Sequence, residues 1–265
     1  MSKAKYRAKV IEKERLSGDI YSLLLNVGPE VSEAVPGQFI DLYSEDKSRM
    51  LPRPISICDV DKEKQQMRIV FRIAGAGTEE FSLKEPGDEI DIVGPLGNGY
   101  YMPEADGNEC HVLLGGGIGI PPMLYLAKCL FESGIPKESI KTVLGFRDAD
   151  TFLAGEFEKY SEVYITSDNG AVGIKGNVID GIKEYGIKAD KIYACGPTPM
   201  LRGIKAFTKE NGISAQISLE ERMACGIGAC LACVCKSEEV DDHSKVNNKR
   251  ICKDGPVFFA EEVVL

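Results

Sequence analysis

Hydrophobic and polar residues alternate over short segments in the first third of the chain. Turn residues separate these segments, which cover residues 6–12, 20–27, 38–43, 55–60, 67–73 and 89–93. Alternation with a period of two directs one face of each segment to a core and the other to solvent. Short strands at this spacing predict an antiparallel β-barrel over residues 1–100.

The pattern changes beyond residue 109, where apolar strands alternate with helical segments. Strands are predicted at residues 110–114, 140–146, 163–166 and 191–195, and helices at 121–133 and 199–211. This order predicts a parallel sheet with crossover helices, and we assign the α/β domain to residues 101–214. The rest, residues 215–265, is too short for a large core of its own and forms a small third domain.

Composition and charge narrow the class of protein. A chain of 265 residues is long enough for about two domains with proper cores, and 43% hydrophobic with 28% charged residues is typical of globular proteins. A net charge of −9 argues against nucleic acid and anionic lipid as partners. The start lacks a signal-peptide pattern, and the most apolar window, 112–127, is broken by glycines and prolines. We expect no membrane association and a cytoplasmic location.

Cysteines gather near the end of the sequence. Four of the nine follow the pattern C-x4-C-x2-C with one thiol further on: Cys225, Cys230, Cys233 and Cys252. In a reducing compartment such clustering favours metal binding, and this is the plant-type spacing of a 2Fe–2S cluster. Small residues between the first two thiols, Gly226, Gly228 and Ala229, let backbone amides approach the cluster sulfurs.

Two alternatives to this ligand set stay open. A structural zinc site also uses four thiolates, but zinc sites usually present two compact pairs, whereas here three cysteines share one loop. Cys235 is an alternative fourth ligand, because an extended segment would place it on the same face as Cys233. We favour Cys252, because a thiol from a separate segment closes the cage more easily.

Two stretches of the barrel suit a phosphate-bearing ligand. The first is Arg53, Pro54, Ile55 and Ser56, where flanking prolines stiffen an arginine whose planar guanidinium suits a pyrophosphate. The Ser56 hydroxyl could hydrogen-bond the edge of a ring. The second is a strand end and a glycine turn: Val70, Phe71, Arg72, Gly77 and Thr78. Thr78 is predicted as a helix N-cap, and the glycine before it allows phosphate to approach free amides.

Two stretches of the α/β domain suit a nucleotide. A glycine turn between a strand and a proline-opened helix contains Gly115, Gly116, Gly117 and Gly119, and a later strand ends in Cys195, Gly196 and Pro197. Strand ends of this kind line the crevice in which nucleotides bind. The turn departs from the G-x-G-x-x-G fingerprint, because Ile120 stands where the last glycine should be. Arg147 could serve NAD or NADP, so the sequence leaves the choice open.

The barrel and nucleotide motifs together resemble the ferredoxin reductase superfamily. By this resemblance the first pair of stretches holds FAD, the second pair binds NAD(P), and Cys195 lies near the nicotinamide. The whole chain resembles the electron-transfer subunits of bacterial, NAD-linked dihydroorotate dehydrogenase B. Residues 218–233, 250–258, 166–170 and 173–176 carry that likeness, although the insert between Cys233 and Cys252 is longer than in the family.

The resemblance implies a function in pyrimidine (UMP) biosynthesis. A partner subunit oxidises dihydroorotate on FMN, and electrons cross the 2Fe–2S cluster and FAD to NAD, since a flavin exchanges both one and two electrons. The assembly implied is a heterotetramer with two copies of each subunit. The substrate site lies on the partner, so we expect no catalytic residue here and assign no role to His111 or His243.

Two other functions stay open. One is a reductase subunit for another acceptor, such as a bifurcating ferredoxin:NADP oxidoreductase, in which an aspartate replaces one cluster cysteine. The other is a zinc-stabilised interaction module without enzymatic activity.

Overall fold

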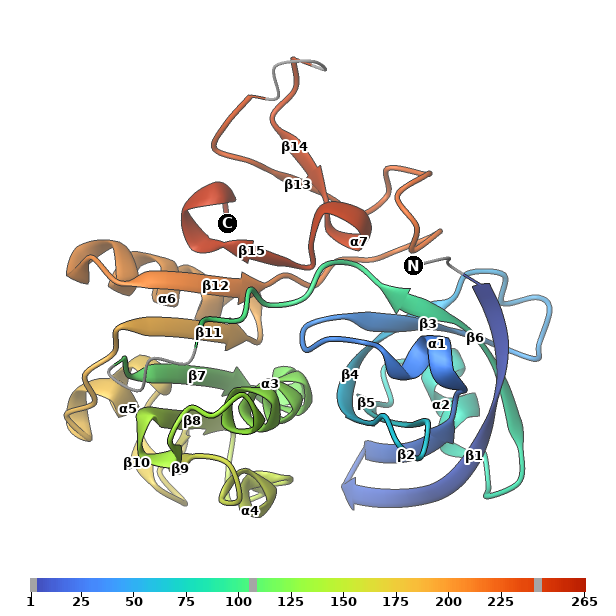
Figure 1. Cartoon of the computed structure of the whole chain (residues 1–265), viewed down its shortest axis with the longest axis horizontal. Helices are drawn as coiled ribbons and strands as arrows, with labels where there is room; N and C mark the ends of the chain where they lie inside the picture. Colours follow the sequence, from blue (N-terminus) through green and yellow to red (C-terminus); the bar gives the residue numbers. More distant parts are fainter. Residues whose placement is uncertain (1–3, 105–108, 241–244) are drawn as a thin grey trace.

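The computed structural model describes residues 4–104, 109–240 and 245–265. Three parts follow one another along the chain: a β-barrel, an α/β sheet and a cysteine-rich segment that lies across the top of both (Figure 1). His243 lies outside the described residues. Within them, no helix is long and apolar enough to cross a membrane.

Six antiparallel strands close the barrel, as the alternating pattern predicts. In spatial order they are β1 (Ala4–Ser17), β2 (Ile20–Asn26), β5 (Gln66–Arg72), β4 (Arg53–Asp61), β3 (Phe39–Tyr43) and β6 (Glu89–Leu96). Side chains that point inward, among them Leu23, Ile40 and Ile69, are fully buried and form the barrel core. Two short helices, α1 (Pro29–Ser32) and α2 (Ala76–Ser82), lie in the connections from β2 to β3 and from β5 to β6.

The second part is a seven-stranded sheet. Its order is β10 (Ile174–Lys175), β9 (Glu162–Ser167), β8 (Ile140–Phe146), β7 (His111–Gly116), β11 (Lys191–Cys195), β12 (Ser214–Ser218) and β15 (Val257–Phe259). All neighbours are parallel except β15, which pairs antiparallel with β12. The α-helices of this part are α3 (Ile120–Glu132), α4 (Ala154–Phe157), α5 (Val178–Glu184) and α6 (Thr198–Asn211). Single 3-10 turns are η1 (Gly117–Gly119) and η2 (Lys137–Ser139).

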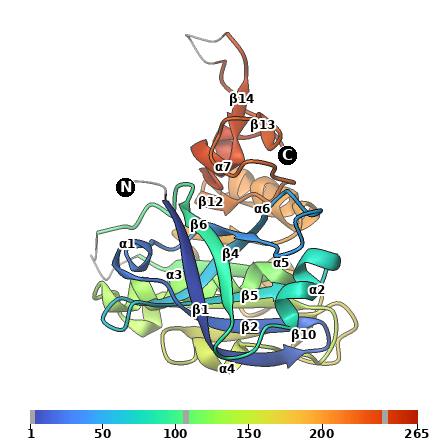
Figure 2. The ribbon, with the colours of Figure 1, turned by 90° about the vertical axis from the view of Figure 1, so that its right-hand side faces the viewer.

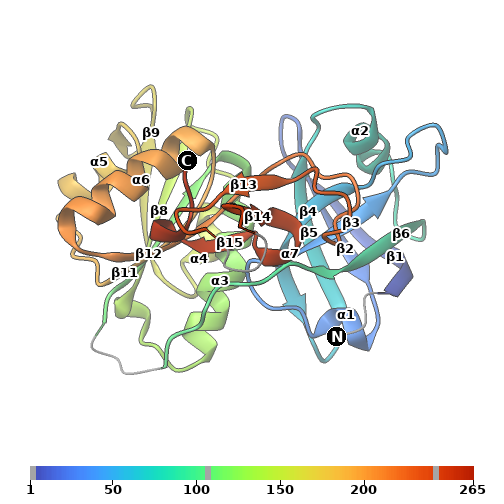
Figure 3. The same ribbon diagram turned by 90° about the horizontal axis from the view of Figure 1, so that it is seen from above.

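The cysteine-rich segment is built onto the other two parts. It holds β13 (Val234–Lys236), β14 (Asn248–Arg250), α7 (Ile251–Asp254), β15 and η3 (Ala260–Glu262). Seen from the side and from above, β13, β14 and α7 stand over the junction between barrel and sheet (Figures 2 and 3). Within the charged stretch that follows the cysteines, residues 248–250 form β14 and pair with β13. The boundary that we propose at residue 215 falls inside β12.

Helix α3 connects the barrel to the sheet. The Tyr125 hydroxyl donates to the carbonyl of Ala34 at 2.7 Å, and Lys128 Nζ lies 2.8 Å from a carboxylate oxygen of Asp59 on β4. On the neighbouring strand, Arg68 pairs with Glu156 of α4 at 2.6 Å. Because α3 begins at the glycine turn and packs on β4, the predicted flavin and nucleotide motifs are held in one fixed relation.

Candidate functional site

The predicted flavin motif begins at Arg53, the first residue of β4. The side chain of Arg53 packs against the first turn of α2. A Cβ atom added at Gly77 would fall 2.0 Å from Arg53 Nε, so only glycine allows the guanidinium to lie there. Among the described residues, Arg53 forms no ion pair with an acidic side chain, and its hydrogen bond goes to the carbonyl of Leu51. A guanidinium without a counter-charge beside free helix amides suits a diphosphate, as FAD would supply.

Thr78 does not cap the helix as predicted. The cap is Gly75, and Thr78 stands in the first turn, where its hydroxyl accepts hydrogen bonds from the amides of Ala74 at 2.8 Å and Gly75 at 3.2 Å. The prediction was wrong because a threonine hydroxyl three residues into a helix closes the turn as well as a cap would. Thr78 therefore shapes the glycine turn, and its contact with FAD stays a prediction.

The end of β5 contributes little side-chain surface to this site. Val70 and Phe71 are buried, and Phe71 packs edge-on against Phe81 with ring centroids 6.5 Å apart. Arg72 Nε lies 3.4 Å from Asp19 Oδ1. Any contact that Val70 or Phe71 makes with a flavin must therefore come from the backbone.

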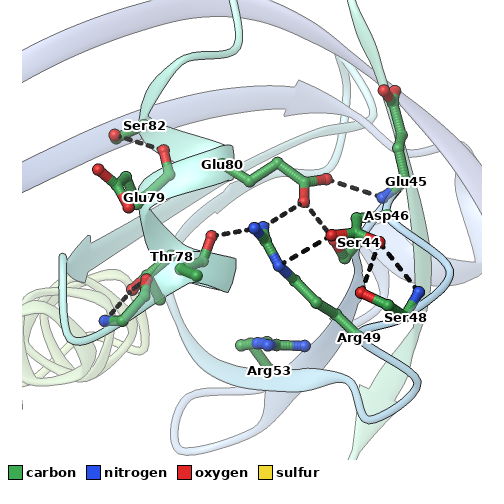
Figure 4. A network of polar contacts seen from close by, with 12 residues as sticks. Ser44, Glu45, Asp46, Ser48, Arg49, Arg53, Thr78, Glu79, Glu80 and Ser82 are labelled. Atoms are coloured by element: carbon green, nitrogen blue, oxygen red, sulfur yellow. Dashed lines mark hydrogen bonds and ion pairs between the residues drawn. The ribbon is translucent and has the colours of Figure 1, made fainter.

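Sequence reasoning missed a polar network that surrounds this site (Figure 4). Glu80 of α2 accepts hydrogen bonds from the hydroxyl of Ser44 and from the amide of Glu45 at 2.7 Å, and it pairs with Arg49 at 2.9 Å. Arg49 also donates to the carbonyl of Ala76 at 2.7 Å. These bonds tie the loop between β3 and β4 to α2, the helix against which the Arg53 side chain packs. An acidic residue inside α2 was the only signal in the sequence.

The two nucleotide motifs meet at the carboxyl edge of the parallel sheet. Cys195 pairs in register with Gly115, and a Cβ added at Gly119 would lie 2.3 Å from the Cys195 carbonyl oxygen. Gly117 has φ +54° with open space beside it, so the turn can approach a ligand closely. Helices α3 and α6 both begin here, at the point where the strand order reverses, which is where open α/β sheets bind ligands.

Packing explains two more glycines of these motifs. Cβ atoms at Gly116 and at Gly196 would each lie 2.5 Å from Met200, which fills the space between the two turns. Burial raises the pKa of Cys195 to about 12, which favours the neutral thiol at physiological pH. Arg147 follows β8, and its carbonyl accepts a hydrogen bond from the Asn169 amide at 3.4 Å.

The four predicted cluster thiols approach one another as two pairs. Cys225 and Cys230 lie within hydrogen-bonding reach, and so do Cys233 and Cys252. In the part of the chain that the structure describes, no three potential ligands converge on one point as a single metal ion requires. Two pairs of thiolates fit a two-iron cluster, in which each iron takes two of the four sulfurs.

Backbone amides favour the thiolate at the first ligand. Burial raises the pKa of Cys225, but hydrogen bonds from the backbone of Ile227 and Cys230 outweigh it, and the pKa falls to about 6. The amide of Ala229 lies 3.3 Å from the Cys225 sulfur. A loop whose amides point at sulfur suits both the thiolate and the sulfides of a cluster.

Cys252 is better placed than Cys235 as the fourth ligand. Its amide donates to Cys233 Sγ at 3.4 Å, and both thiols are buried. Burial, together with the neighbouring Cys233, raises the pKa of Cys252 to about 12, so binding a metal here would have to displace the thiol proton. Cys235 is half-buried on β13 opposite Lys249. Arg250 donates to the Gly228 carbonyl at 3.1 Å and so ties β14 to the cysteine loop.

A buried carboxyl group lies between the flavin strand and the cysteine loop. Asp41 of β3 pairs with Pro54 of β4, is fully buried, and neither carboxyl oxygen has a hydrogen-bond partner. A Cβ at Gly226 would lie 1.9 Å from Asp41 Oδ2, so the loop touches the barrel here. Burial raises the pKa of Asp41 to about 7, helped by the charge of Cys225. A lone acid in the apolar segment 39–43 was the signal that sequence reasoning passed over.

Comparisons with known proteins agree with this layout. Residues 220–264 match the family described as the iron-sulfur cluster binding domain of dihydroorotate dehydrogenase B. Residues 7–101 match the oxidoreductase FAD-binding domain family. These matches support an iron–sulfur centre and FAD, and they do not support the zinc-stabilised module.

Curated relatives match over the full length of the chain. An electron transfer subunit of dihydroorotate dehydrogenase B (NAD(+)) from Shouchella clausii is 40% identical, with 100% of both chains covered. The protein of the same description from Streptococcus pneumoniae is 42% identical over 97% of both chains.

Solved structures share the architecture. The structure of an NADH-dependent reduced ferredoxin-NADP oxidoreductase is 33% identical, with a TM-score of 0.84 over 97% of this chain and 89% of the other. A ferredoxin reductase of carbazole 1,9a-dioxygenase is 19% identical with a TM-score of 0.68 over 80% of this chain and 67% of the other, and shows the fold alone.

Proposed function

This chain belongs to the family of dihydroorotate dehydrogenase B electron-transfer subunits, and we propose that it passes electrons from the FMN of a catalytic subunit to NAD. It is an oxidoreductase subunit of pyrimidine biosynthesis. FAD, when bound, would convert between the single electrons of an iron–sulfur centre and the hydride of NAD. The substrate site lies on the partner subunit.

Contacts of the barrel with both of the other predicted sites support this proposal. Asp41 on β3 touches the cysteine loop at Gly226, and Asp59 on β4 pairs with Lys128 of α3, which begins at the nucleotide turn. The flavin strands β3 and β4 therefore contact both the cysteine loop and the helix that begins at the nucleotide turn. A relay from a one-electron centre to a hydride acceptor needs a flavin that both can reach.

Each group has residues whose chemistry fits it. Arg53, with its guanidinium against Gly77, would hold the FAD diphosphate, and Ser56 would contact the ring. The turn from Gly115 to Gly119 and the strand end at Cys195 would receive NAD. Four thiolates would bind the cluster: Cys225, Cys230, Cys233 and Cys252.

Partner and location belong to the same proposal. We propose a catalytic subunit that oxidises dihydroorotate, two copies of each subunit in the complex, and a cytoplasmic location, which suits nine free thiols. The likeness to the ferredoxin-NADP oxidoreductase favours a second function, electron exchange with ferredoxin. The cluster motif argues for the first, because all four ligand positions here are cysteines.

Cofactor analysis of anaerobically purified protein tests the proposal. We expect one FAD, two irons and two acid-labile sulfides per chain, together with co-purification of an FMN subunit. Stoichiometric zinc or colourless protein would refute the relay. Transfer of electrons to ferredoxin without any response to dihydroorotate plus its subunit would favour the second function.

Substitution of one cluster ligand separates the two halves of the relay. Cys230→Ser should abolish NAD reduction driven by dihydroorotate in the complex, while NADH still reduces FAD at the wild-type rate, because the flavin and nucleotide sites are untouched. Cys235→Ser is the matched control and should keep iron content and both activities. Surviving activity in Cys230→Ser would show that electrons take another route.

A further inference from the structure

A tyrosine in the segment that joins the barrel to the sheet is buried between them (Figure 1). Tyr100 lies between the end of β6 and the start of β7 and is 4% exposed. Its hydroxyl donates to the carbonyl of Ala194 on β11 at 3.0 Å, and its ring packs edge-on against Tyr193 with centroids 5.9 Å apart. Tyr100 therefore contacts the two residues that precede Cys195, at the strand end proposed to receive NAD.

The barrel anchors the backbone of Tyr100. Its amide donates to the carbonyl of Pro36 at 2.8 Å. Gly37 has φ +96°, and a Cβ atom added there would lie 2.9 Å from Cδ2 of the Tyr100 ring, so only glycine leaves room for the ring. Pro36 and Gly37 lie just before β3, whose first residue pairs with Ser56 of the flavin motif on β4.

Strand β12 holds the same segment against the sheet. The Gln216 side chain donates to the Tyr101 carbonyl at 3.0 Å and accepts from the Tyr101 amide at 2.7 Å. On the same strand, Ser218 pairs in register with Cys195, and its hydroxyl lies within hydrogen-bonding reach of the Cys195 thiol and the Tyr100 hydroxyl. Tyr100 is thus fixed from the barrel side and from the sheet side.

The hydroxyl group of Tyr100 is the feature that packing alone does not require. Tyr100 belongs to the apolar core cluster of the sheet, where a phenylalanine would fill the same space without a polar atom. A buried hydroxyl is unfavourable unless it is hydrogen-bonded. Burial raises the pKa of Tyr100 well above its usual value, so the hydroxyl keeps its proton and remains a donor to β11 at physiological pH.

We propose that Tyr100 is a positioning residue for hydride transfer, which fixes the strand end at Cys195 at a set distance from the flavin ring beside Ser56. This inference rests on FAD and NAD binding as proposed above. Contacts run from Ser56 through the start of β3 to Tyr100 and on to β11. Reacting atoms must approach to about 3–3.5 Å, and a displacement of about 1 Å can slow a reaction about 100-fold. Without the hydroxyl, β11 loses its hydrogen bond to the linking segment, and its end can shift.

The test compares Tyr100→Phe with Tyr101→Phe in the FAD-loaded full chain. Tyr101→Phe is the matched control, because Tyr101 is 73% exposed and its hydrogen bonds to Gln216 come from its backbone. In Tyr100→Phe we expect reduction of FAD by saturating NADH, followed by stopped flow, to slow about tenfold. The NADH concentration that gives half the maximal rate should stay within about twofold of wild type, because the residues that bind NADH are unchanged. Ser218→Ala should slow the same step several-fold.

A second measurement reports on geometry without turnover. NAD stacked on reduced flavin gives a long-wavelength charge-transfer absorbance. In photoreduced protein with NAD added, this band should be weaker in Tyr100→Phe and Ser218→Ala than in wild type and in Tyr101→Phe. Unchanged rates and bands in Tyr100→Phe and Ser218→Ala, or equal losses in Tyr101→Phe, would overturn the inference and leave the proposed function intact. Should Tyr100→Phe fail to retain FAD, Ser218→Ala decides the question. Failure of NADH to reduce FAD in the wild-type protein would refute the proposed function itself.

Discussion

At the scale of single residues, Asp41 occupies an environment that disfavours its charge. The carboxyl group is sealed between β3 and the cysteine loop, without a hydrogen-bond partner, and burial raises its pKa from 3.8 to about 7. Leaving a buried polar group unpaired costs free energy. The presence of Asp41 here therefore indicates that its carboxyl group has a role where the barrel meets the cysteine loop at Gly226.

The raised pKa predicts how the cluster-free protein responds to pH. The folded chain binds the Asp41 proton more tightly than the unfolded chain, so this contribution to stability is fully present below 3.8 and is lost as pH rises through about 7. Asp41→Asn should therefore be more stable than wild type at about pH 8, by up to about 4 kcal/mol, with little difference at about pH 4. Urea unfolding followed by circular dichroism measures this.

Asp91 serves as the control, because its pKa is lowered in the folded chain whereas that of Asp41 is raised. Hydrogen bonding and charge from Lys5 and Arg7 lower the pKa of Asp91. Asp91→Asn should slightly reduce stability at about pH 8, and this difference should shrink as the pH falls below 3.8, because this group stabilises the fold only when ionised. A pH-independent difference between wild type and Asp41→Asn would contradict the environment assigned to Asp41.

At the scale of elements, α3 joins two functions in one helix. It begins at the glycine turn of the nucleotide motif, and further along it Tyr125 bonds the carbonyl of Ala34 while Lys128 bonds Asp59 on the flavin strand β4. Lys128 donates both to Asp59 at 2.8 Å and to the carbonyl of Val60 at 3.0 Å. A shift of this helix would change the distance between flavin ring and nicotinamide, on which hydride transfer depends steeply.

Removing this contact should slow hydride transfer without weakening cofactor binding. In Lys128→Met the apolar stem remains but both hydrogen bonds are lost, and we expect a loss of about 1–3 kcal/mol in unfolding free energy. Stopped-flow reduction of bound FAD by NADH should slow several-fold, with FAD affinity unchanged. Lys62→Met, which breaks an exposed pair with Glu33, should leave both quantities unaltered. Equal rates in the two variants would argue against a positioning role for α3.

Hydrophobic periodicity predicted the strands and helices whose own sequence shows a clear repeat. The six barrel strands and the helices at 121–133 and 199–211 alternate or repeat clearly enough to be found, and the sequence patterns of the glycine turns and cysteine loop locate the candidate site. Strand β15 has three residues and exists only because β12 lies beside it, and β14 is a charged segment paired across an insert. Asp41, Arg49 and Glu80 gain their roles from contacts between distant segments, which no local pattern contains.

At the scale of the whole molecule, the cluster segment depends on both of its neighbours. Strand β15 extends the nucleotide sheet, while Asn98 after β6 holds the end of α7. The Asn98 amide donates to the Gly255 carbonyl at 2.6 Å, and its side chain donates to the carbonyls of Lys253 and Asp254 at 3.3 and 3.0 Å. Helix α7 carries Cys252, so the barrel itself positions the fourth ligand.

Loss of the Asn98 side chain should therefore loosen the cluster while leaving the flavin site intact. In Asn98→Ala, two hydrogen bonds to the end of α7 disappear, each worth about 1 kcal/mol, so cluster release to a chelator should accelerate by up to about thirtyfold. Bleaching of visible absorbance follows the release, and FAD content should match wild type. Asn211→Ala removes a hydrogen bond within α6 and should release the cluster at the wild-type rate. If Asn98→Ala kept its cluster as long as that control, the cysteine segment would hold Cys252 without help from the barrel, and the coupling of the three parts through α7 would be wrong.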